Sequence, residues 1–546
     1  MISSSAGPSE GDDAKGGGTG EVPVYCHRNR EGGIRLDISL ASVSDRGRIA
    51  GYAVAIFLSS ASLMVLEIAA ARLLAPYIGV SLYSWTAIIG VVLGGLSLGN
   101  WIGGLWADRG GSGRSAGLAL GFGALSCLGV LLLLTLVAQP LQRSELGLMT
   151  LSFLFVAALF FLPAMLLGVV TPLLTTLALR LDPRTGHIVG MMHALAALGS
   201  IIGTFATGYL FIQYFGTYAV IIGTGAVLGL LALAFLLHAR WSLLGLALLA
   251  VAIAGWTQVR GGYLQPCDRE SNYFCIKVVD MSGKVPFGHA RGMVLDHLLH
   301  GISHETRPEL LISPYTHLMD ELIAAHLGDR ESPSFFFAGG GSYSQPRAVQ
   351  SLYPGARIVV AELDPQVTAV AQSSLYFEPG DVRIIHSDAR QVLQRLQGER
   401  FDVIVGDVFH DIAVPNHLVA REYAELVRSR LAPGGLYTLN VVDVYPDPRL
   451  VKSMLKTLRQ VFARVRVWIE DRTWPDSRVT YVISAGDTHS APERLASRRG
   501  PRREWHDVTA SLAGQGTPLS ALPLLTDDHV PVERLLSRLI FTELGR

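Results

Sequence analysis

The chain has 546 residues, more than one ordinary domain holds, so two or more domains are expected. Hydrophobic residues make up 50% of it, charged residues only 16%, and the mean hydropathy is +0.37, which points to a membrane protein. The formal net charge is +0 and no basic face is clustered, so nucleic acid is not expected as a partner.

The first 47 residues are rich in Gly, Ser and Asp and carry no apolar period. This composition predicts a disordered tail. The tail has no apolar core directly behind a basic start, so it is not expected to be a cleavable signal peptide.

Residues 48–258 consist of long apolar runs separated by short polar breaks. Roughly twenty residues are needed to cross the hydrocarbon at about 1.5 Å per residue, and all runs but the last reach that length. The sequence therefore predicts a multi-pass α-helical membrane domain of about seven spans. The runs cover approximately 49–70, 84–106, 116–138, 148–170, 188–211, 216–237 and 241–257.

Ionisable residues in this half lie near the ends of the predicted spans. Glu67 and Arg72 end the first span, where such side chains more often pair or reach the interface than act at membrane depth. Asp108, Arg109 and Arg114 resemble the short cytoplasmic loop of major-facilitator transporters.

Positive charge falls on alternate connections of the predicted bundle, and the positive-inside rule makes these connections cytoplasmic. An odd number of spans then leaves the C-terminal half outside. Two alternatives keep that half inside: the last, shortest run does not cross, or residues 148–179 hide an eighth crossing. The charges are Arg46, Arg48, Arg109, Arg114, Arg180, Arg184 and Arg240.

The composition turns soluble at Gly262. Residues 262–332 are predicted to form a small β-rich part, with a loop and strand in 268–280, a strand in 293–299 and a helix in 314–327. Residues 333–546 alternate strands with helices, which predicts an α/β Rossmann-like domain with a mostly parallel sheet. Later elements are expected as helices in 417–431 and 448–462, a strand in 436–442 and an antiparallel pair in 465–470 and 479–485.

Four successive predicted strands of this domain end in residues suited to a nucleoside site. The first ends in Gly339–Gly341, where backbone can approach a ligand, and the next ends in Glu362, which can accept hydrogen bonds from ribose hydroxyls. The third and fourth end in Asp388 and Asp407. Ligands of open α/β sheets bind outside the carboxyl ends of the strands, so the four endings together predict a nucleoside site.

Residues 338–411 resemble the spermidine synthase (polyamine aminopropyltransferase) family, in a membrane-fused, multi-pass form built on the S-adenosylmethionine-dependent methyltransferase fold. The resemblance rests on the GGG loop and on the strings ELD, SDA and FDVIVGD. It implies decarboxylated S-adenosylmethionine, or S-adenosylmethionine itself, as cosubstrate, with no permanently bound cofactor and no metal. The residues implied to bind it are Gly339, Gly340, Gly341, Glu362, Asp364, Asp388 and Ala389.

In that family an amine nitrogen attacks the carbon next to a sulfonium, and methylthioadenosine leaves. The resemblance makes Asp407 the catalytic carboxylate that accepts the proton or stabilises the developing ammonium. It implies a diamine such as putrescine as substrate, with Tyr273, Tyr315, His317 and Asp411 as candidate binding residues. The lipid bilayer is the other expected partner, and a homo-oligomer is compatible with the sequence.

Several positions that hold charged amines in the family differ in this chain: Ser342 replaces an Asp, Phe274 a Gln and Thr316 a His. A buried ammonium without a carboxylate partner is strongly disfavoured. Two alternatives therefore stay open beside the aminopropyltransferase: an S-adenosylmethionine-dependent methyltransferase, and a non-catalytic nucleoside- or polyamine-binding module on a transporter-like bundle.

The expected location is the cell (inner) membrane. The synthase-like half is expected to be cytoplasmic, because its cosubstrate is a cytoplasmic metabolite, although the span parity points outside. Cys267 and Cys275 flank one short segment and would suit a disulfide outside. Two free thiols are nevertheless the expectation.

Overall fold

The structure is a computed structural model that describes residues 41–144, 146–182, 184–285, 288–408, 414–471, 478–488 and 492–537. The chain divides into two units, residues 1–51 and 52–546. Of the first unit, 41–51 is described and is helical, because helix α1 begins at Ala41. The predicted tail therefore ends too late, at 47, and its residues 1–40 lie outside the described ranges.

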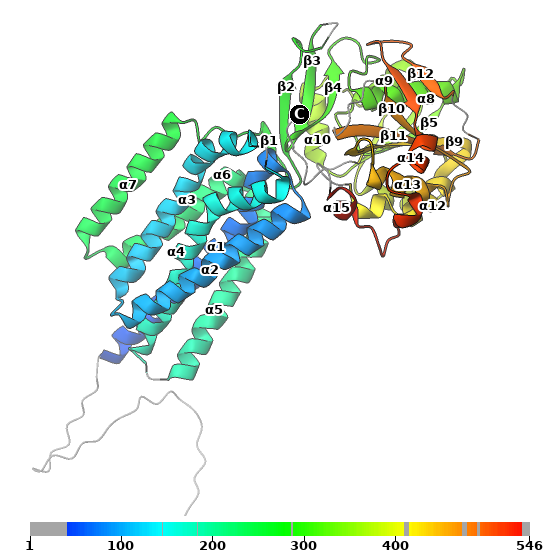
Figure 1. The fold of residues 1–546 in the computed structure, drawn as a ribbon. Coiled ribbons are helices and arrows are strands. Elements are labelled where there is room, and N and C mark those ends of the chain that lie inside the picture. Colours follow the sequence, from blue (N-terminus) through cyan, green and yellow to red (C-terminus); the bar gives the residue numbers. More distant parts are fainter. Residues whose placement is uncertain are drawn as a thin grey trace, which may run out of the picture. The chain divides into compact units, whose positions relative to one another are not determined.

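Long apolar helices form the N-terminal half of the second unit (Figure 1). Each helix contains most of one predicted run, but α1 extends beyond both ends of its run and α4 beyond the end of its own. Between the first two runs, Ser81 caps α2: its hydroxyl accepts the N–H of Ser84, whose own hydroxyl accepts the N–H of Ser81. The helices are α1 (Ala41–Ile78), α2 (Leu82–Asp108), α3 (Gly113–Gln142), α4 (Leu148–Leu179), α5 (Thr185–Ala206), a π-helical turn (Thr207–Phe211), α6 (Ile212–Leu236) and α7 (Arg240–Val259).

Among the described residues, six helices are long and apolar enough to cross a membrane, with Thr185–Leu236 counted as one of 52 residues. As a single straight helix this run would measure about 78 Å, more than twice the roughly 30 Å of hydrocarbon. It contains Gly216 in a non-helical conformation (φ 77°, ψ 161°), at the boundary between the fifth and sixth predicted spans. An eighth crossing within 148–179 is excluded, because α4 is continuous from Leu148 to Leu179.

Glycines bring some helices of the bundle into backbone contact. A Cβ at Gly99 of α2 would lie 2.0 Å from the carbonyl oxygen of Met165 in α4, and one at Gly168 would lie 2.7 Å from that of Leu96. A Cβ at Gly199 of α5 would lie 2.2 Å from the carbonyl oxygen of Phe57 in α1. Small residues at these points allow the close packing that stabilises helix pairs in lipid.

The β-rich part of the second half is an antiparallel sheet in the order β1-β2-β3-β4. Residues 293–299, predicted as one strand, instead close the β3–β4 hairpin, since Asp296 adopts φ 55° and turns the chain. Helix α8 (Pro314–Leu327) has the predicted bounds. The strands are β1 (Arg269–Glu270), β2 (Cys275–Asp280), β3 (Ala290–Leu295) and β4 (Leu298–His304).

A larger sheet follows, with the strand order β12-β13-β10-β11-β9-β8-β5-β6-β7 in the described ranges. Strands β5 to β9 are parallel, and β10 and β11 form the predicted antiparallel pair. The strands are β5 (Ser334–Ala338), β6 (Arg357–Glu362), β7 (Arg383–His386), β8 (Phe401–Gly406), β9 (Leu431–Val444), β10 (Arg464–Glu470), β11 (Arg478–Gly486), β12 (Arg494–Ala496) and β13 (Glu504–Asp507).

Helices alternate with the parallel strands, so this half has the Rossmann-like, methyltransferase-type fold that the sequence predicts. Strand β5 lies between β6 and β8, so the chain reverses its direction of winding at β5 and a crevice opens there at the carboxyl edge. The helices are α9 (Ser344–Leu352), α10 (Pro365–Ser374), α11 (Ala389–Arg395), α12 (Arg421–Arg430), α13 (Arg449–Leu458), α14 (Thr509–Gly514) and α15 (Val532–Leu535).

Candidate active site

The glycine loop after β5 lies directly against the end of β8. Gly339 has φ 85°, and a Cβ there would lie 2.1 Å from the carbonyl oxygen of Asp407. Gly341 has φ 53°, and its Cβ would lie 2.7 Å from Asp407 Oδ2. Both positions combine a left-handed conformation with a close approach, and only glycine satisfies both without strain.

Glu362, at the end of β6, is buried and held by backbone. Its Oε2 accepts the Gly340 N–H at 2.8 Å, and its Oε1 accepts the Asp364 N–H at 2.9 Å. Burial raises the pKa of its carboxyl to about 7, against the effect of these two hydrogen bonds. Each carboxylate oxygen has a second lone pair, so Glu362 can still accept ribose hydroxyls.

Asp407 follows β8 and receives hydrogen bonds from elements distant in sequence. Asn440 of β9 donates its Nδ2–H to Oδ1 at 2.9 Å. The single hydroxyl proton of Tyr315 in α8 is shared between the His300 carbonyl at 2.8 Å and Asp407 Oδ2 at 3.4 Å. Burial raises the pKa of the Asp407 carboxyl to about 6, and the two side-chain donors oppose that rise. The carboxylate form is therefore available at neutral pH.

Two cavities meet at Asp407 and His300. The first, on the nucleoside side, is lined by Phe274, Leu295, His300, Gly339, Gly341, Ala361, Glu362, Leu363, Val367, Ala389, Asp407, Val408, Pro415 and Leu418. The second has a volume of about 310 Å³ and is lined by Leu298, Leu299, His300, Tyr315, Asp407, Asn440, Val442, Arg478 and Thr480. A group bound in the first cavity can thus react with one bound in the second, beside the Asp407 carboxylate.

Asp364 and Asp388 both act as helix N-caps. Asp364 accepts the Gln366 N–H at 2.9 Å, and Asp388 accepts the Gln391 N–H at 3.0 Å. The second oxygen of Asp388 lies 2.7 Å from His417 Nε2. Neither acid lines the nucleoside-side cavity, whereas Ala389 does. Their roles toward a cosubstrate stay predictions.

The four candidate substrate residues are placed differently. Tyr315 reaches Asp407, but the His317 ring packs on Trp505 at 5.1 Å and lines neither cavity. Tyr273 lines neither cavity. Its carbonyl accepts a hydrogen bond from Arg72 of α1. Asp411 lies outside the described residues. The geometry therefore brings one of the four, Tyr315, to the Asp407 carboxylate.

The departures from the family pattern also have definite places. Ser342 is buried and donates to Ser344 Oγ at 3.1 Å, and Thr316 donates to the Ser313 carbonyl at 3.0 Å. Phe274 forms apolar wall in the nucleoside-side cavity. Sequence reasoning missed Asn440 and His300, which lie on β9 and β4. Asn440 lies near Asp407 because β9 pairs with β8, whereas His300 comes from the separate four-stranded sheet. No local sequence pattern encodes either tertiary arrangement.

Cys267 and Cys275 form a disulfide, so the expectation of two free thiols is wrong. The cause is the β1–β2 pairing, in which Glu270 faces Cys275 and Asp268 donates its N–H to the Ile276 carbonyl at 2.9 Å. This pairing brings the two Cα atoms to 5.2 Å, within the range that a disulfide spans.

Comparison with known proteins identifies the domain. Residues 336–491 match the family described as the spermine/spermidine synthase domain. A polyamine aminopropyltransferase of Vibrio vulnificus is 32% identical over 127 residues, which cover 23% of this chain and 41% of that protein. A probable polyamine aminopropyl transferase of Bifidobacterium longum is 26% identical over 230 residues, 39% of this chain and 51% of that protein.

The chain thus spans about half or less of the length of these relatives. A solved structure, a probable spermidine synthase from Corynebacterium glutamicum, superposes with a TM-score of 0.40 at 20% identity and covers 48% of this chain and 95% of that one. The family match falls on β5 to β11, the segment that contains the glycine loop, Glu362 and Asp407. The C-terminal region of this chain contains a spermine/spermidine synthase domain.

Proposed function

We propose that the protein is a membrane-bound polyamine aminopropyltransferase that transfers an aminopropyl group from decarboxylated S-adenosylmethionine to a diamine such as putrescine. The observation that carries the proposal is the meeting of two cavities at Asp407, one of them walled by the glycine loop and Glu362. The relatives named as aminopropyltransferases support the same chemistry.

The proposed reaction is a direct displacement. The amine nitrogen, held in the cavity of Asn440 and Tyr315, attacks the carbon next to the sulfonium. A new N–C bond forms, the C–S bond breaks, and its electron pair stays on sulfur as methylthioadenosine leaves. The proton of the resulting ammonium passes to Asp407. Because the sulfonium is already a good leaving group, orientation and this carboxylate are the main requirements.

A methyltransferase that uses ordinary S-adenosylmethionine is the second candidate. It is favoured by Ser342, which stands where the family has an Asp for the free amine of the decarboxylated cosubstrate, and by Phe274, which replaces a Gln among the groups that hold charged amines. Ser342 is buried and bonded to Ser344, and Phe274 is apolar. Ordinary S-adenosylmethionine keeps a carboxylate that compensates the charge of its own amine, so it does not require an acidic side chain at these positions.

Mass spectrometry of products separates the candidates. The purified full-length protein is incubated with putrescine and either decarboxylated or ordinary S-adenosylmethionine. We expect spermidine and methylthioadenosine with the decarboxylated cosubstrate. A methylated amine formed with the ordinary cosubstrate would replace this assignment by a methyltransferase. Tight methylthioadenosine binding without turnover of either would favour the binding-module alternative.

For the side of the membrane, we propose that the synthase domain lies opposite the arginine-bearing connections. Support comes from the continuity of α4, the break at Gly216 and the 20 residues of α7, which span about 30 Å. These features favour an odd number of crossings. The Cys267–Cys275 disulfide also suits an oxidising compartment. The proposal departs from the cytoplasmic location that the cosubstrate alone would favour.

Fusions of alkaline phosphatase, which is active only outside the cytoplasm, test this side in a bacterial host. We expect a fusion at the C-terminus to be active and one inserted after Gly111 to be inactive. An inactive C-terminal fusion, with expression confirmed by immunoblot, would place the domain in the cytoplasm.

A further inference from the structure

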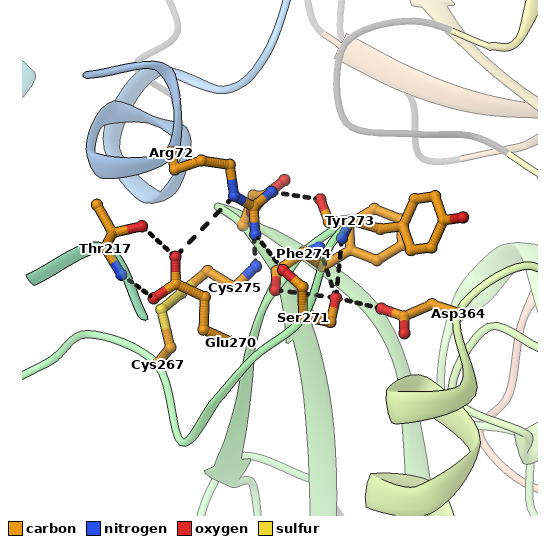
Figure 2. Close-up of polar contacts among 10 residues, drawn as sticks. Arg72, Thr217, Cys267, Glu270, Ser271, Tyr273, Phe274, Cys275 and Asp364 are labelled. Carbon is orange, nitrogen blue, oxygen red and sulfur yellow. Dashed lines mark hydrogen bonds and ion pairs between the residues drawn. A yellow bond between two sulfur atoms is a disulfide. The ribbon is translucent and has the colours of Figure 1, made fainter. Parts of the chain in front are cut away.

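Arg72, near the end of α1, holds a turn of the synthase domain. Its Nη1 donates to the Tyr273 carbonyl at 2.6 Å and its Nη2 to the Ser271 carbonyl at 2.8 Å, as Figure 2 shows. The sequence placed Arg72 among residues that pair near a helix end, and the structure supplies the pairing. Two hydrogen bonds from one planar guanidinium fix both the position and the orientation of this turn.

A second contact holds the same segment to α6. The Glu270 carboxylate accepts the Thr217 N–H at 2.9 Å and also the Thr217 hydroxyl. Thr217 follows the non-helical Gly216. The backbone N–H of Thr217 is therefore not used by a helical hydrogen bond and can bond a side chain. Glu270 Oε1 lies 4.0 Å from Arg72 Nε, and both side chains are nearly buried.

The turn leads directly into the nucleoside site. The Ser271 hydroxyl donates to the Asp364 carboxylate and accepts the N–H groups of Tyr273 and Phe274 at 3.0 and 2.9 Å. Asp364 in turn donates its N–H to Glu362 Oε1 at 2.9 Å. The Phe274 ring is part of the cavity wall. A displacement of the turn would therefore move both a wall of the cavity and the support of Glu362.

A disulfide and the charge of Arg72 also support the turn and the acid that it contacts. The Cys267–Cys275 disulfide closes the segment that contains the turn, and Cys275 donates its N–H to Asp296 Oδ1 at 2.9 Å. Burial raises the pKa of Asp364, whereas the Ser271 hydrogen bond and the charge of Arg72 lower it. Arg72 thus favours the ionised form of the acid that caps α10.

We infer that Arg72 of the membrane bundle is a positioning residue for the nucleoside site, acting through the turn Ser271–Phe274. The inference rests on the proposed function for the identity of the ligand. It assigns a role to the bundle: α1 completes the support of the cosubstrate pocket, so the pocket of the full-length chain is better ordered than that of the domain alone.

The test compares full-length variants in detergent by calorimetric titration with methylthioadenosine and by steady-state kinetics. Arg72→Ala is expected to raise the Kd for methylthioadenosine and the KM for the cosubstrate about tenfold, with kcat changed less than twofold, since a charged hydrogen bond is lost from the support of the site. Arg72→Lys keeps the charge but offers no planar pair of donors. Its Kd and KM are expected to lie between those of the unmutated protein and those of Arg72→Ala.

Arg180 provides a matched control. Its guanidinium also donates to two carbonyls, those of Gly111 and Ala107, both at 2.8 Å, but Ala107 lies in the last turn of α2 and Gly111 in the α2–α3 connection. Arg180→Ala should lower the thermal unfolding midpoint by about as much as Arg72→Ala does, but should leave the Kd for methylthioadenosine unchanged. Ser271→Ala should raise the Kd, as Arg72→Ala does. The fold-increase in Kd of the double variant should be smaller than the product of the two single fold-increases.

The outcomes are distinguishable. Equal Kd values for the unmutated protein, Arg72→Ala and Arg72→Lys would overturn the inference, as would multiplicative effects of Arg72→Ala and Ser271→Ala. If Arg72→Ala does not fold, Arg72→Lys and Ser271→Ala carry the comparison. An unmutated protein that binds methylthioadenosine without transferring aminopropyl groups would refute the proposed function and leave the role of Arg72 standing. Absence of binding to the unmutated protein would refute both.

Discussion

Replacement of Asp407 by Asn is expected to lower kcat by about 10²- to 10⁴-fold, the usual contribution of a positioned general base. The amide has nearly the shape of the carboxylate but cannot accept the proton of the attacking amine. Methylthioadenosine should bind with a Kd within about threefold of the unmutated value, because Glu362 and the glycine loop are unchanged. Product formation and calorimetric titration measure the two quantities separately.

The pH profile adds a second readout for the same variant. Burial places the pKa of Asp407 at about 6, so kcat/KM of the unmutated protein should fall as the pH drops below that value and the carboxylate takes up a proton. The residual activity of Asp407→Asn should lack this limb. Asp402→Asn is the control, since Asp402 lies at the other end of β8 and pairs with Arg330. Equal kcat in all three proteins would remove Asp407 from the reaction.

Replacement of Gly341 by Ala is expected to reduce kcat/KM by at least about tenfold. Its φ of 53° costs an alanine about 1 kcal/mol of stability. The new methyl group would also lie 2.7 Å from Asp407 Oδ2, well inside van der Waals contact. The carboxylate or the loop must therefore shift, and misplacement of a reacting group by about 1 Å can cost 10²-fold. Steady-state kinetics and thermal unfolding measure the two effects.

Gly328 separates backbone strain from this collision. It has a similar φ of 56°, but nothing lies within 4 Å of the position that its Cβ would take. Gly328→Ala should also lower stability, because a φ of 56° with a ψ of −126° is strained for alanine, and should leave kcat/KM unchanged. Equal losses of activity in the two variants would show that strain, rather than the contact with Asp407, is responsible.

The parts of the site that sequence predicted are those encoded by local pattern. An apolar run followed by glycine or an acid marks the end of a buried parallel strand. Glu362 is indeed the last residue of β6, and Gly339, Asp388 and Asp407 lie just beyond the ends of β5, β7 and β8. The bounds of α8 were likewise predictable, since Pro314 begins the helix at its first turn and Gly328 follows its end.

Other parts depend on tertiary structure or were misjudged. Asn440 meets Asp407 because β9 lies beside β8, and strand order is a property of the whole sheet. The sequence alone argues against His317 as a substrate-binding residue beside Tyr315. Residues two apart on a helix lie about 200° around its axis, so His317 cannot share the face of Tyr315. The Cys267–Cys275 pair needed the β1–β2 register, which two short strands do not reveal.

The contact between α2 and α4 bears on what the bundle can transport. At Gly99 and Gly168 the two backbones touch, and the Cβ of any larger residue would collide with a carbonyl. A conduit for a hydrated polyamine needs a gap of several ångströms lined by polar groups. The interface between these two helices provides no such route, so a solute that crosses this bundle must pass between other helices.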